Sequence, residues 1–289
     1  MTTRPVGVGH LTMLDAAPPD WVQLAHDAGF EAVGVRIGVA SPTEEPWPMT
    51  AGSPMLAETL ARIDATGTVV QDVEIVVITP DTRPENFDEL FEVGSRLRAR
   101  FLNVMVTDPD VGRAHDTFAA LCERARPYGL RPCMEGISYT AVRDLETAYR
   151  VLEGTGGGLI VDPLHIQRSG DDIADLRRVD PSALGYLQLC DGPREVPANM
   201  PVPEHLPRGQ SAGADVRQLE SRAGRLLPGE GDIPVADFAA ALPADLPVSV
   251  EAPNRALLEA LGREGFLRRA RQAARRVLDA AASSPPRHP

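Results

Sequence analysis

The sequence contains no lysine, so all 29 of its basic residues are arginines. Schiff-base chemistry, the anchoring of pyridoxal phosphate and a phosphate-loop lysine each require a lysine amine and are therefore excluded. Aromatic residues make up only 4% of the chain, whereas apolar residues make up 43%. We therefore expect a core built from Ala, Val, Leu and Ile.

Long apolar segments and closely spaced cysteines are also lacking. No apolar run approaches the roughly 20 residues that cross a bilayer, and residues 1–8 contain no apolar segment of the secretory type. The cysteines Cys122, Cys133 and Cys190 are widely separated, which is typical of a reducing compartment rather than of a disulfide framework. We expect a cytoplasmic protein.

Positive charge is scarce relative to negative charge. Acidic residues outnumber basic residues by 41 to 29, which gives a formal net charge of −12. An acidic surface repels nucleic-acid backbones and anionic lipids. We therefore expect a small-molecule substrate and neither a nucleic-acid nor a membrane partner.

Eight short apolar runs alternate with stretches of helical spacing. Several runs are nearly continuous Val, Ile and Leu, which is typical of parallel strands buried on both faces. The predicted strands span 6–8, 32–37, 73–78, 101–106, 132–134, 159–161, 185–189 and 247–250. Apolar residues at helical spacing predict helices near 21–28, 87–94, 118–125, 145–152, 235–242 and 255–281.

This alternation predicts an α/β fold, a (β/α)8 TIM barrel. A doubly wound sheet is the competing fold, but no Gly-x-Gly-x-x-Gly turn follows an early strand. We expect a single domain over 1–282 and a disordered tail over 283–289. Two segments, 40–53 and 192–231, lack periodic spacing. We interpret 192–231 as a long irregular βα loop that covers the mouth of its own barrel or of a partner's barrel and sets substrate choice.

Polar residues at the predicted strand ends indicate where the chemistry lies, because the carboxyl ends of barrel strands face the active site. These residues are Glu74, Glu135, Asp162, Gln188 and Glu251. A single carboxylate at a strand end is usually solvated, but four polar residues from strands five to eight would converge. Their three carboxylates repel one another, which favours a bound divalent cation, and an all-oxygen ligand set favours Mg²⁺ or Mn²⁺ over zinc.

The motifs around these residues resemble those of the xylose isomerase-like superfamily of TIM barrels, the sugar phosphate isomerase/epimerase group. They are Glu135, Asp162-Pro163-Leu164-His165, and the segments 187–192, 228–234 and 249–251. The resemblance implies a metal held by Glu135, Asp162, Gln188 and Glu251, with His165 beside it at the substrate. Barrels of this group often pair, so the resemblance also implies a homodimer.

One ligand position and one loop bear on the substrate. Many family members have histidine where this chain has Gln188, whereas those resembling hydroxypyruvate isomerases and some 3-dehydroshikimate dehydratases have glutamine. The segment 192–231 is longer than the corresponding loop of hydroxypyruvate isomerases. The substrate therefore stays open.

The resemblance implies a metal-dependent isomerase or epimerase that acts on a small hydroxy-carbonyl compound through an enediolate. We expect Glu135 and Glu251 to move protons and His165 to donate a hydrogen bond to the developing oxyanion. Arg36, or Arg194 and Arg208 from the long loop, are candidates for binding a carboxylate or phosphate.

The roles of two further residues stay open, as does the reaction. Glu74, like Arg36, either faces the substrate or forms a structural ion pair, and we interpret His10 as a packing residue of the barrel mouth. A dehydratase of the 3-dehydroshikimate or inosose type shares the first proton abstraction and remains the alternative. A zinc phosphodiesterase resembling endonuclease IV needs more histidines and a basic face. A non-enzymatic barrel does not explain the four retained ligands.

Overall fold

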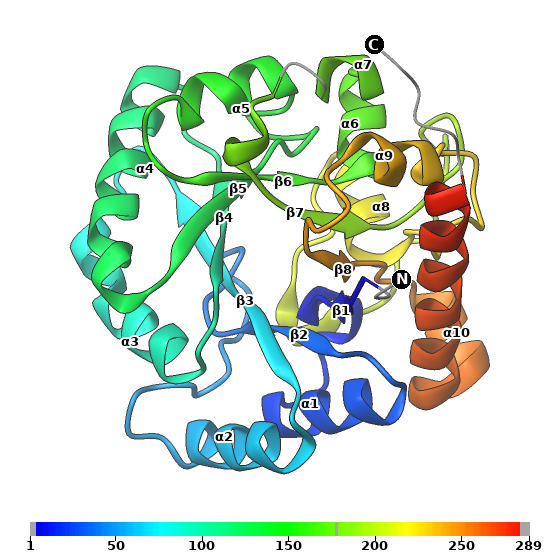
Figure 1. Cartoon of the computed structure of the whole chain (residues 1–289), viewed down its shortest axis with the longest axis horizontal. Coiled ribbons are helices and arrows are strands. Elements are labelled where there is room, and N and C mark those ends of the chain that lie inside the picture. The colour runs from blue at the N-terminus through cyan, green and yellow to red at the C-terminus, as the bar shows by residue number, and fades with distance from the viewer. Residues whose placement is uncertain (1–3, 177–178, 284–289) are drawn as a thin grey trace.

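Eight parallel strands close a barrel in chain order, with β8 paired to β1 (Figure 1). The structure, a computed structural model, describes residues 4–176 and 179–283. The strands are β1 (Val6–Val8), β2 (Ala32–Arg36), β3 (Val69–Ile78), β4 (Phe101–Val106), β5 (Arg131–Glu135), β6 (Gly158–Val161), β7 (Leu184–Leu189) and β8 (Val248–Val250). The predicted TIM barrel is confirmed, and each predicted strand overlaps an observed one.

The helices surround the barrel, and all of them except α8 form an outer layer (Figure 1). They are α1 (Pro18–Asp27), α2 (Pro54–Thr66), α3 (Asp88–Arg96), α4 (Val111–Ala125), α5 (Leu145–Leu152), α6 (Pro163–Ser169), α7 (Ile173–Leu176), α8 (Val216–Ala223), α9 (Val235–Ala241) and α10 (Arg255–Ser283). The predicted helices correspond to α1, α3, α4, α5, α9 and α10. None of the helices in the described residues is long and apolar enough to cross a bilayer.

The interpretation of 192–231 as wholly irregular is wrong, because this segment contains α8. The buried residues of α8 include Glu220, Ser221 and Arg222. A helix that buries polar side chains has no apolar stripe to reveal it in a sequence. The predicted tail begins one residue too early, because Ser283 ends α10, and the rest of that prediction falls outside the described residues.

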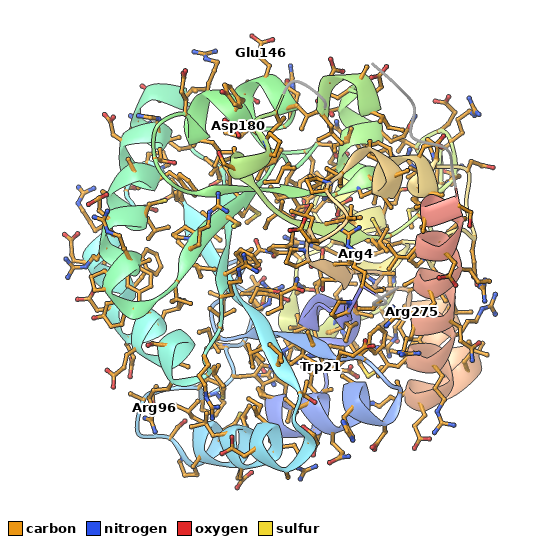
Figure 2. All side chains as sticks on the ribbon, in the orientation of Figure 1. Arg4, Trp21, Arg96, Glu146, Asp180 and Arg275 are labelled. Atoms are coloured by element: carbon orange, nitrogen blue, oxygen red, sulfur yellow. The ribbon has the colours of Figure 1, made fainter. Side chains whose placement is uncertain are left out.

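Packing differs between the outer layer and the barrel interior. Charged side chains such as Arg96, Glu146 and Asp180 project from the periphery, whereas Trp21 lies inside (Figure 2). A separate buried cluster of Phe101, Cys133, Ile160 and Tyr186 comes from β4 to β7. Phe101, Cys133 and Tyr186 lie at or before the middle of their strands, so this part of the cluster fills the barrel away from the carboxyl ends of the strands.

Candidate active site and metal centre

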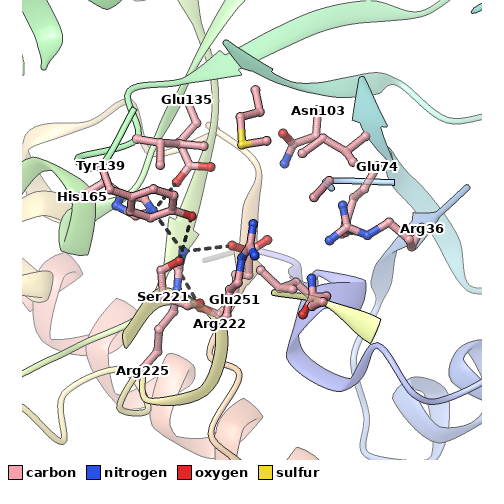
Figure 3. Close-up of a pocket in the computed structure, with 16 residues that line it drawn as sticks. Arg36, Glu74, Asn103, Glu135, Tyr139, His165, Ser221, Arg222, Arg225 and Glu251 are labelled. Atoms are coloured by element: carbon pink, nitrogen blue, oxygen red, sulfur yellow. Dashed lines mark hydrogen bonds and ion pairs between the residues drawn. The ribbon is translucent and has the colours of Figure 1, made fainter. Parts of the chain in front are cut away.

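A cavity lies at the carboxyl ends of the strands. Figure 3 shows Glu135, Tyr139 and His165 on one side of the cavity, and Arg36, Glu74 and Asn103 on the other. The lining residues are Leu11, Arg36, Ala40, Glu74, Ile75, Asn103, Met105, Glu135, Ile137, Tyr139, His165, Gln210, Ser221, Arg222, Arg225 and Glu251.

The structure brings the predicted metal ligands to neighbouring strand ends. Glu135 ends β5, Asp162 follows β6, Gln188 lies in β7 and Glu251 follows β8, and all four side chains are buried. The Asp162 carboxylate also caps α6, because its Oδ1 accepts the N–H groups of Leu164 at 2.8 Å and His165 at 3.2 Å. This cap fixes the orientation of Asp162.

Arg225 joins this group of carboxylates, which sequence reasoning missed. Its side chain is buried, donates a hydrogen bond from Nη1 to Asp162 Oδ2, and places Nη2 3.3 Å from Glu251 Oε2. Nη1 also donates to the Glu251 backbone oxygen at 3.2 Å. Arg225 stands three residues before the 228–234 motif, so its proximity to a recognised motif was the available signal.

Among the described residues, no group donates a hydrogen bond to two buried oxygens of the cluster. They are Glu135 Oε1 and Gln188 Oε1, while the Gln188 amide nitrogen donates to Glu251 Oε1 at 2.8 Å. Glu135, Asp162 and His165 each offer a ligand atom, and these atoms lie within 4.8 Å of one another. Three carboxylates and the Arg225 guanidinium sum to −2 when ionised. Unsatisfied oxygens and this charge fit a divalent cation.

The pKa values of the three carboxyl groups reflect their burial and their closeness to one another. Burial, together with repulsion by Asp162 and Glu251, raises the pKa of Glu135 well above its usual range. Burial also raises the pKa of Glu251 to about 7, although Arg225 opposes the shift. Burial acts in the same sense on Asp162, but there the attraction of Arg225 prevails and the pKa falls to about 2. Proton-transfer capacity therefore resides in Glu135 and Glu251.

His165 lies between the cluster and the wall of the cavity. Its Nδ1 is 3.1 Å from Ser138 Oγ, and its Nε2 is 3.5 Å from Glu135 Oε1. Burial lowers the pKa of His165 to about 3, so the imidazole is neutral near pH 7. A neutral imidazole can donate from one nitrogen and accept, or bind a metal, at the other.

On the opposite wall, Arg36 and Glu74 line the cavity and also form an ion pair. Arg36 Nε lies 3.4 Å from Glu44 Oε1 and 3.5 Å from Glu74 Oε2, with all three side chains buried. Glu74 Oε1 accepts the backbone N–H of His10 at 2.9 Å. Two carboxylates thus offset the charge of Arg36, so its environment does not favour an additional anion.

His10 supports this wall as the predicted packing residue. Its ring stacks on Trp21 with centroids 5.1 Å apart. Its Nδ1 accepts the Arg36 backbone N–H at 2.9 Å, and its Nε2 lies 2.9 Å from the Ala16 backbone oxygen. His10 is not among the residues that line the cavity.

The structure does not bring Arg194 and Arg208 to the cavity. Arg194 is exposed. The Arg208 guanidinium lies 3.9 Å from the centroid of the Trp47 ring and donates to the backbone oxygens of Glu45 and Pro46. Arg208 therefore joins the segment 192–231 to the segment 40–53. Its guanidinium is held by residues that do not line the cavity.

The segment 192–231 nevertheless forms part of the cavity wall, through Gln210, Ser221, Arg222 and Arg225. Its anchor is a buried ion pair in which Arg168 donates to both carboxylate oxygens of Glu220, at 2.7 and 2.8 Å. These lining residues were missed by sequence reasoning, because a polar helix inside an aperiodic segment gives no apolar pattern.

Comparison with known proteins places this site in a family. A family model described as xylose isomerase-like TIM barrel matches residues 22–278. The chain belongs to this family. The inosose isomerase of Halalkalibacterium halodurans is 33% identical over 76 residues, which are 25% of this chain and 27% of that protein. The match thus spans about a quarter of the relative's length.

Solved structures of the xylose isomerase-like family share the fold over nearly the whole chain. A crystal structure of the IolI protein with a bound zinc atom has a TM-score of 0.73 and 17% identity, and the match covers 97% of this chain and all of that one. The probable 3-DHS dehydratase AsbF from Bacillus anthracis has a TM-score of 0.67 and 12% identity, with coverages of 93% and 98%. These similarities show the fold alone.

Proposed function

We propose that the protein is a divalent-metal-dependent isomerase or epimerase of a small hydroxy-carbonyl compound. The observation that carries this proposal is the buried group of three carboxylates, two of which, Glu135 and Glu251, line the cavity. Buried oxygens of Glu135 and Gln188 beside them accept no hydrogen bond from the described residues. Family membership and the partial match to an inosose isomerase support the reaction class.

Glu135, Asp162, Gln188 and Glu251 would hold the metal. A bound divalent cation would polarise the substrate carbonyl and stabilise negative charge on its oxygen. This all-oxygen ligand set favours Mg²⁺ or Mn²⁺.

The side chains of the chain supply the proton transfers. Glu251, with a pKa raised to about 7 by burial, can remove a proton from carbon near neutral pH. Glu135, on another wall of the same cavity, can return a proton to the adjacent carbon or to the opposite face. Neutral His165 can donate a hydrogen bond to the carbonyl oxygen as negative charge develops on it.

A dehydratase remains the second candidate, because a partly buried hydroxyl pair lies beside the cluster. Tyr139 and Ser221 both line the cavity, and their hydroxyl oxygens are 3.1 Å apart. Burial raises the pKa of Tyr139, which keeps its hydroxyl protonated and able to donate to a leaving hydroxyl group. The first proton abstraction is common to both reactions.

The test is proton exchange in deuterated water with Mn²⁺ present and a panel of ketoses, inososes, hydroxy acids and 3-dehydroshikimate. An isomerase or epimerase yields a product of unchanged mass apart from incorporated deuterium. A dehydratase yields a product lighter by one water, with a new conjugated absorbance. Absence of exchange and of product across the panel would contradict both candidates.

A further inference from the structure

We propose that Arg222 binds a carboxylate group of the substrate, so that the substrate is a hydroxy-carbonyl acid rather than a neutral sugar. This inference rests on the proposed function and narrows its substrate class. Three arginines line the cavity, and they differ in whether a carboxylate of the protein offsets their positive charge.

Arg222 lies in the last turn of α8 and lines the cavity. Only 6% of the residue is exposed, although it carries a full positive charge. Figure 3 shows it beside Glu251, between the side of the cavity that holds Glu135 and the side that holds Arg36. A charge removed from water in this way requires an anion or several hydrogen bonds.

The partners of Arg222 in the protein are neutral. Its Nη1 donates to the backbone oxygen of Ser211. The Gln218 amide oxygen, in the orientation that satisfies its hydrogen bonds, accepts from Nη1 and Nη2 at 3.1 Å each. Within the described residues, Arg222 forms no ion pair.

The other two arginines of the cavity differ in this respect. Arg225 is paired with Asp162 and Glu251, and Arg36 with Glu44 and Glu74. Among the described arginines that line the cavity, Arg222 is therefore the one whose positive charge is not paired with a carboxylate of the protein and can bind an anionic ligand. Because of this contrast, we assign anion binding to Arg222. The residues predicted from the sequence for this role were Arg36, Arg194 and Arg208, and not Arg222.

A carboxylate fits this position better than a phosphate does. A guanidinium matches a planar carboxylate with two parallel hydrogen bonds and one opposite charge. A phosphate monoester carries a charge of about −1.5 to −2 near pH 7 and would require a second unpaired cation. The described part of the cavity wall offers none, and the chain has no lysine.

The opposite wall is suited to hydroxyl groups. Glu74 offers carboxylate oxygens that accept from hydroxyls, and the Asn103 amide can both donate and accept. A hydroxy-carbonyl acid would thus place its carboxylate at Arg222, its reacting carbons between Glu135 and Glu251, and its hydroxyls towards Glu74 and Asn103.

The experiment measures dissociation constants by calorimetry for the full chain with Mn²⁺. Two probes are six-membered cyclic hydroxy-ketones: 3-dehydroshikimate carries a carboxylate, and an inosose is neutral. Fructose and fructose 6-phosphate form the pair that tests phosphate. The variant is Arg222→Gln, and the matched control is Arg208→Gln, which lies in the same segment but contacts Trp47 outside the cavity.

We expect the unmodified protein to bind 3-dehydroshikimate at least about tenfold more tightly than the inosose, since a charged hydrogen-bonded pair contributes on that scale. Arg222→Gln should weaken binding of 3-dehydroshikimate by about tenfold or more and leave inosose binding within about twofold. Arg208→Gln should leave both dissociation constants unchanged within the same margin.

Three results would overturn the inference. They are a preference of the unmodified protein for the inosose, an equal weakening of both cyclic probes by Arg222→Gln, and tighter binding of fructose 6-phosphate than of 3-dehydroshikimate. The first and third need no variant, so the test survives if Arg222→Gln misfolds. Because the readout is binding, loss of the carboxylate preference in a protein that still exchanges protons in deuterated water would refute this inference alone. Carboxylate binding without exchange would refute the proposed reaction alone.

Discussion

At the scale of single residues, the buried carboxylates Glu135, Asp162 and Glu251 hold more negative charge than their neighbour Arg225 offsets. Glu135 and Glu251 both have pKa values raised first by burial. Their ionised forms are therefore costly unless a cation lies nearby. The same property that makes them ligands makes them proton carriers, so substitution has to separate the two roles.

The substitutions Glu135→Gln and Glu251→Gln separate the role of metal ligand from that of proton carrier, because glutamine retains an oxygen ligand but loses the basic carboxylate. We expect each variant to bind metal, more weakly than the unmodified protein, and to lose at least ~10²-fold in turnover. Steady-state rates on an identified substrate and metal titration give the two readouts. Glu58→Gln, an exposed carboxylate on α2, is the control.

Near-native turnover of both glutamine variants would rule out the paired-glutamate mechanism. Loss in only one of them would indicate that a single residue acts as both base and acid, which is the pattern expected of the dehydratase.

His10 makes the stability of the fold sensitive to acid. Burial lowers its pKa to about 3 from the usual 6.5 of histidine, so below pH 6.5 the unfolded chain takes up a proton that the folded protein does not. This contribution to stability is present above pH 6.5 and is lost as the pH falls towards 3. Between pH 7 and 5 it amounts to about 2 kcal/mol.

Denaturant unfolding at pH 7 and at pH 5 measures this loss. His10→Gln cannot titrate and should show a smaller decrease in the free energy of unfolding between the two pH values. His26→Gln, at an exposed position, should retain the decrease of the unmodified protein. An identical decrease in the His10 and His26 variants would assign the acid sensitivity to other groups.

The positions of the carboxylates were predictable at this scale, but those of the arginines were not. A carboxylate at the end of an apolar run is brought to the barrel mouth by the strand that precedes it, so Glu135, Asp162 and Glu251 followed from the strands. Arg225 and Arg222 reach the cavity from a long connection, whose path depends on tertiary contacts. Gln188 was found through its place near the end of β7.

At the scale of elements, the strands were more predictable than the connections. Parallel strands buried on both faces are continuous apolar runs, and all eight were found. Helix α2 was missed although Ser53 caps it and Leu56, Leu60 and Ile63 have helical spacing. Glu74 was expected at a strand end but lies within β3, where the register with β4 shifts between Glu74 and Val76. This shift lets a residue in mid-strand reach the cavity.

Helix α8 is held by charge rather than by apolar packing, and this difference can be measured. The Arg168–Glu220 side chains are 2% and 0% exposed, whereas those of Arg217 and Asp215 on the same helix are 32% and 36% exposed. Breaking a buried pair by removing one partner costs about 3–5 kcal/mol, and an exposed pair contributes about 0–1 kcal/mol.

We therefore expect Glu220→Gln to lower the free energy of unfolding by about 3 kcal/mol and to speed proteolysis within 192–231. Asp215→Asn keeps an oxygen that can cap α8 and should cost less than about 1 kcal/mol. Chemical denaturation and limited proteolysis check both values. Equal effects of the two variants would show that the buried pair does not anchor the segment.

At the scale of the whole molecule, the two ends of the barrel interior differ in character. The Phe101 and Tyr186 rings, 5.3 Å apart, belong to the cluster that fills the interior away from the site. The segments 192–231 and 40–53 meet at the other end through Arg208 and Trp47. The site is thus enclosed by parts of the chain far apart in the sequence, and its ligands come from four strands.

Under the proposed function, a metal held by side chains from four strands would constrain the entire barrel. A ligand that binds only the folded state adds RT ln(1 + [L]/Kd) to stability, about 2.7 kcal/mol at a hundredfold excess over Kd. Removal of metal by a chelator should therefore lower the melting temperature by several degrees. Added Mn²⁺ or Mg²⁺ should restore it.

Asp162→Asn is the variant that tests whether the restoration comes from this site. The asparagine oxygen can still accept the backbone N–H groups of Leu164 and His165, so the cap of α6 is retained while the ligand charge is lost. We expect this variant to melt at the same temperature with chelator and with Mn²⁺. Asp232→Asn removes a carboxylate outside the cluster and should keep the full response. A melting temperature of the unmodified protein that is the same with and without chelator would refute the metal site, whatever reaction the cavity supports.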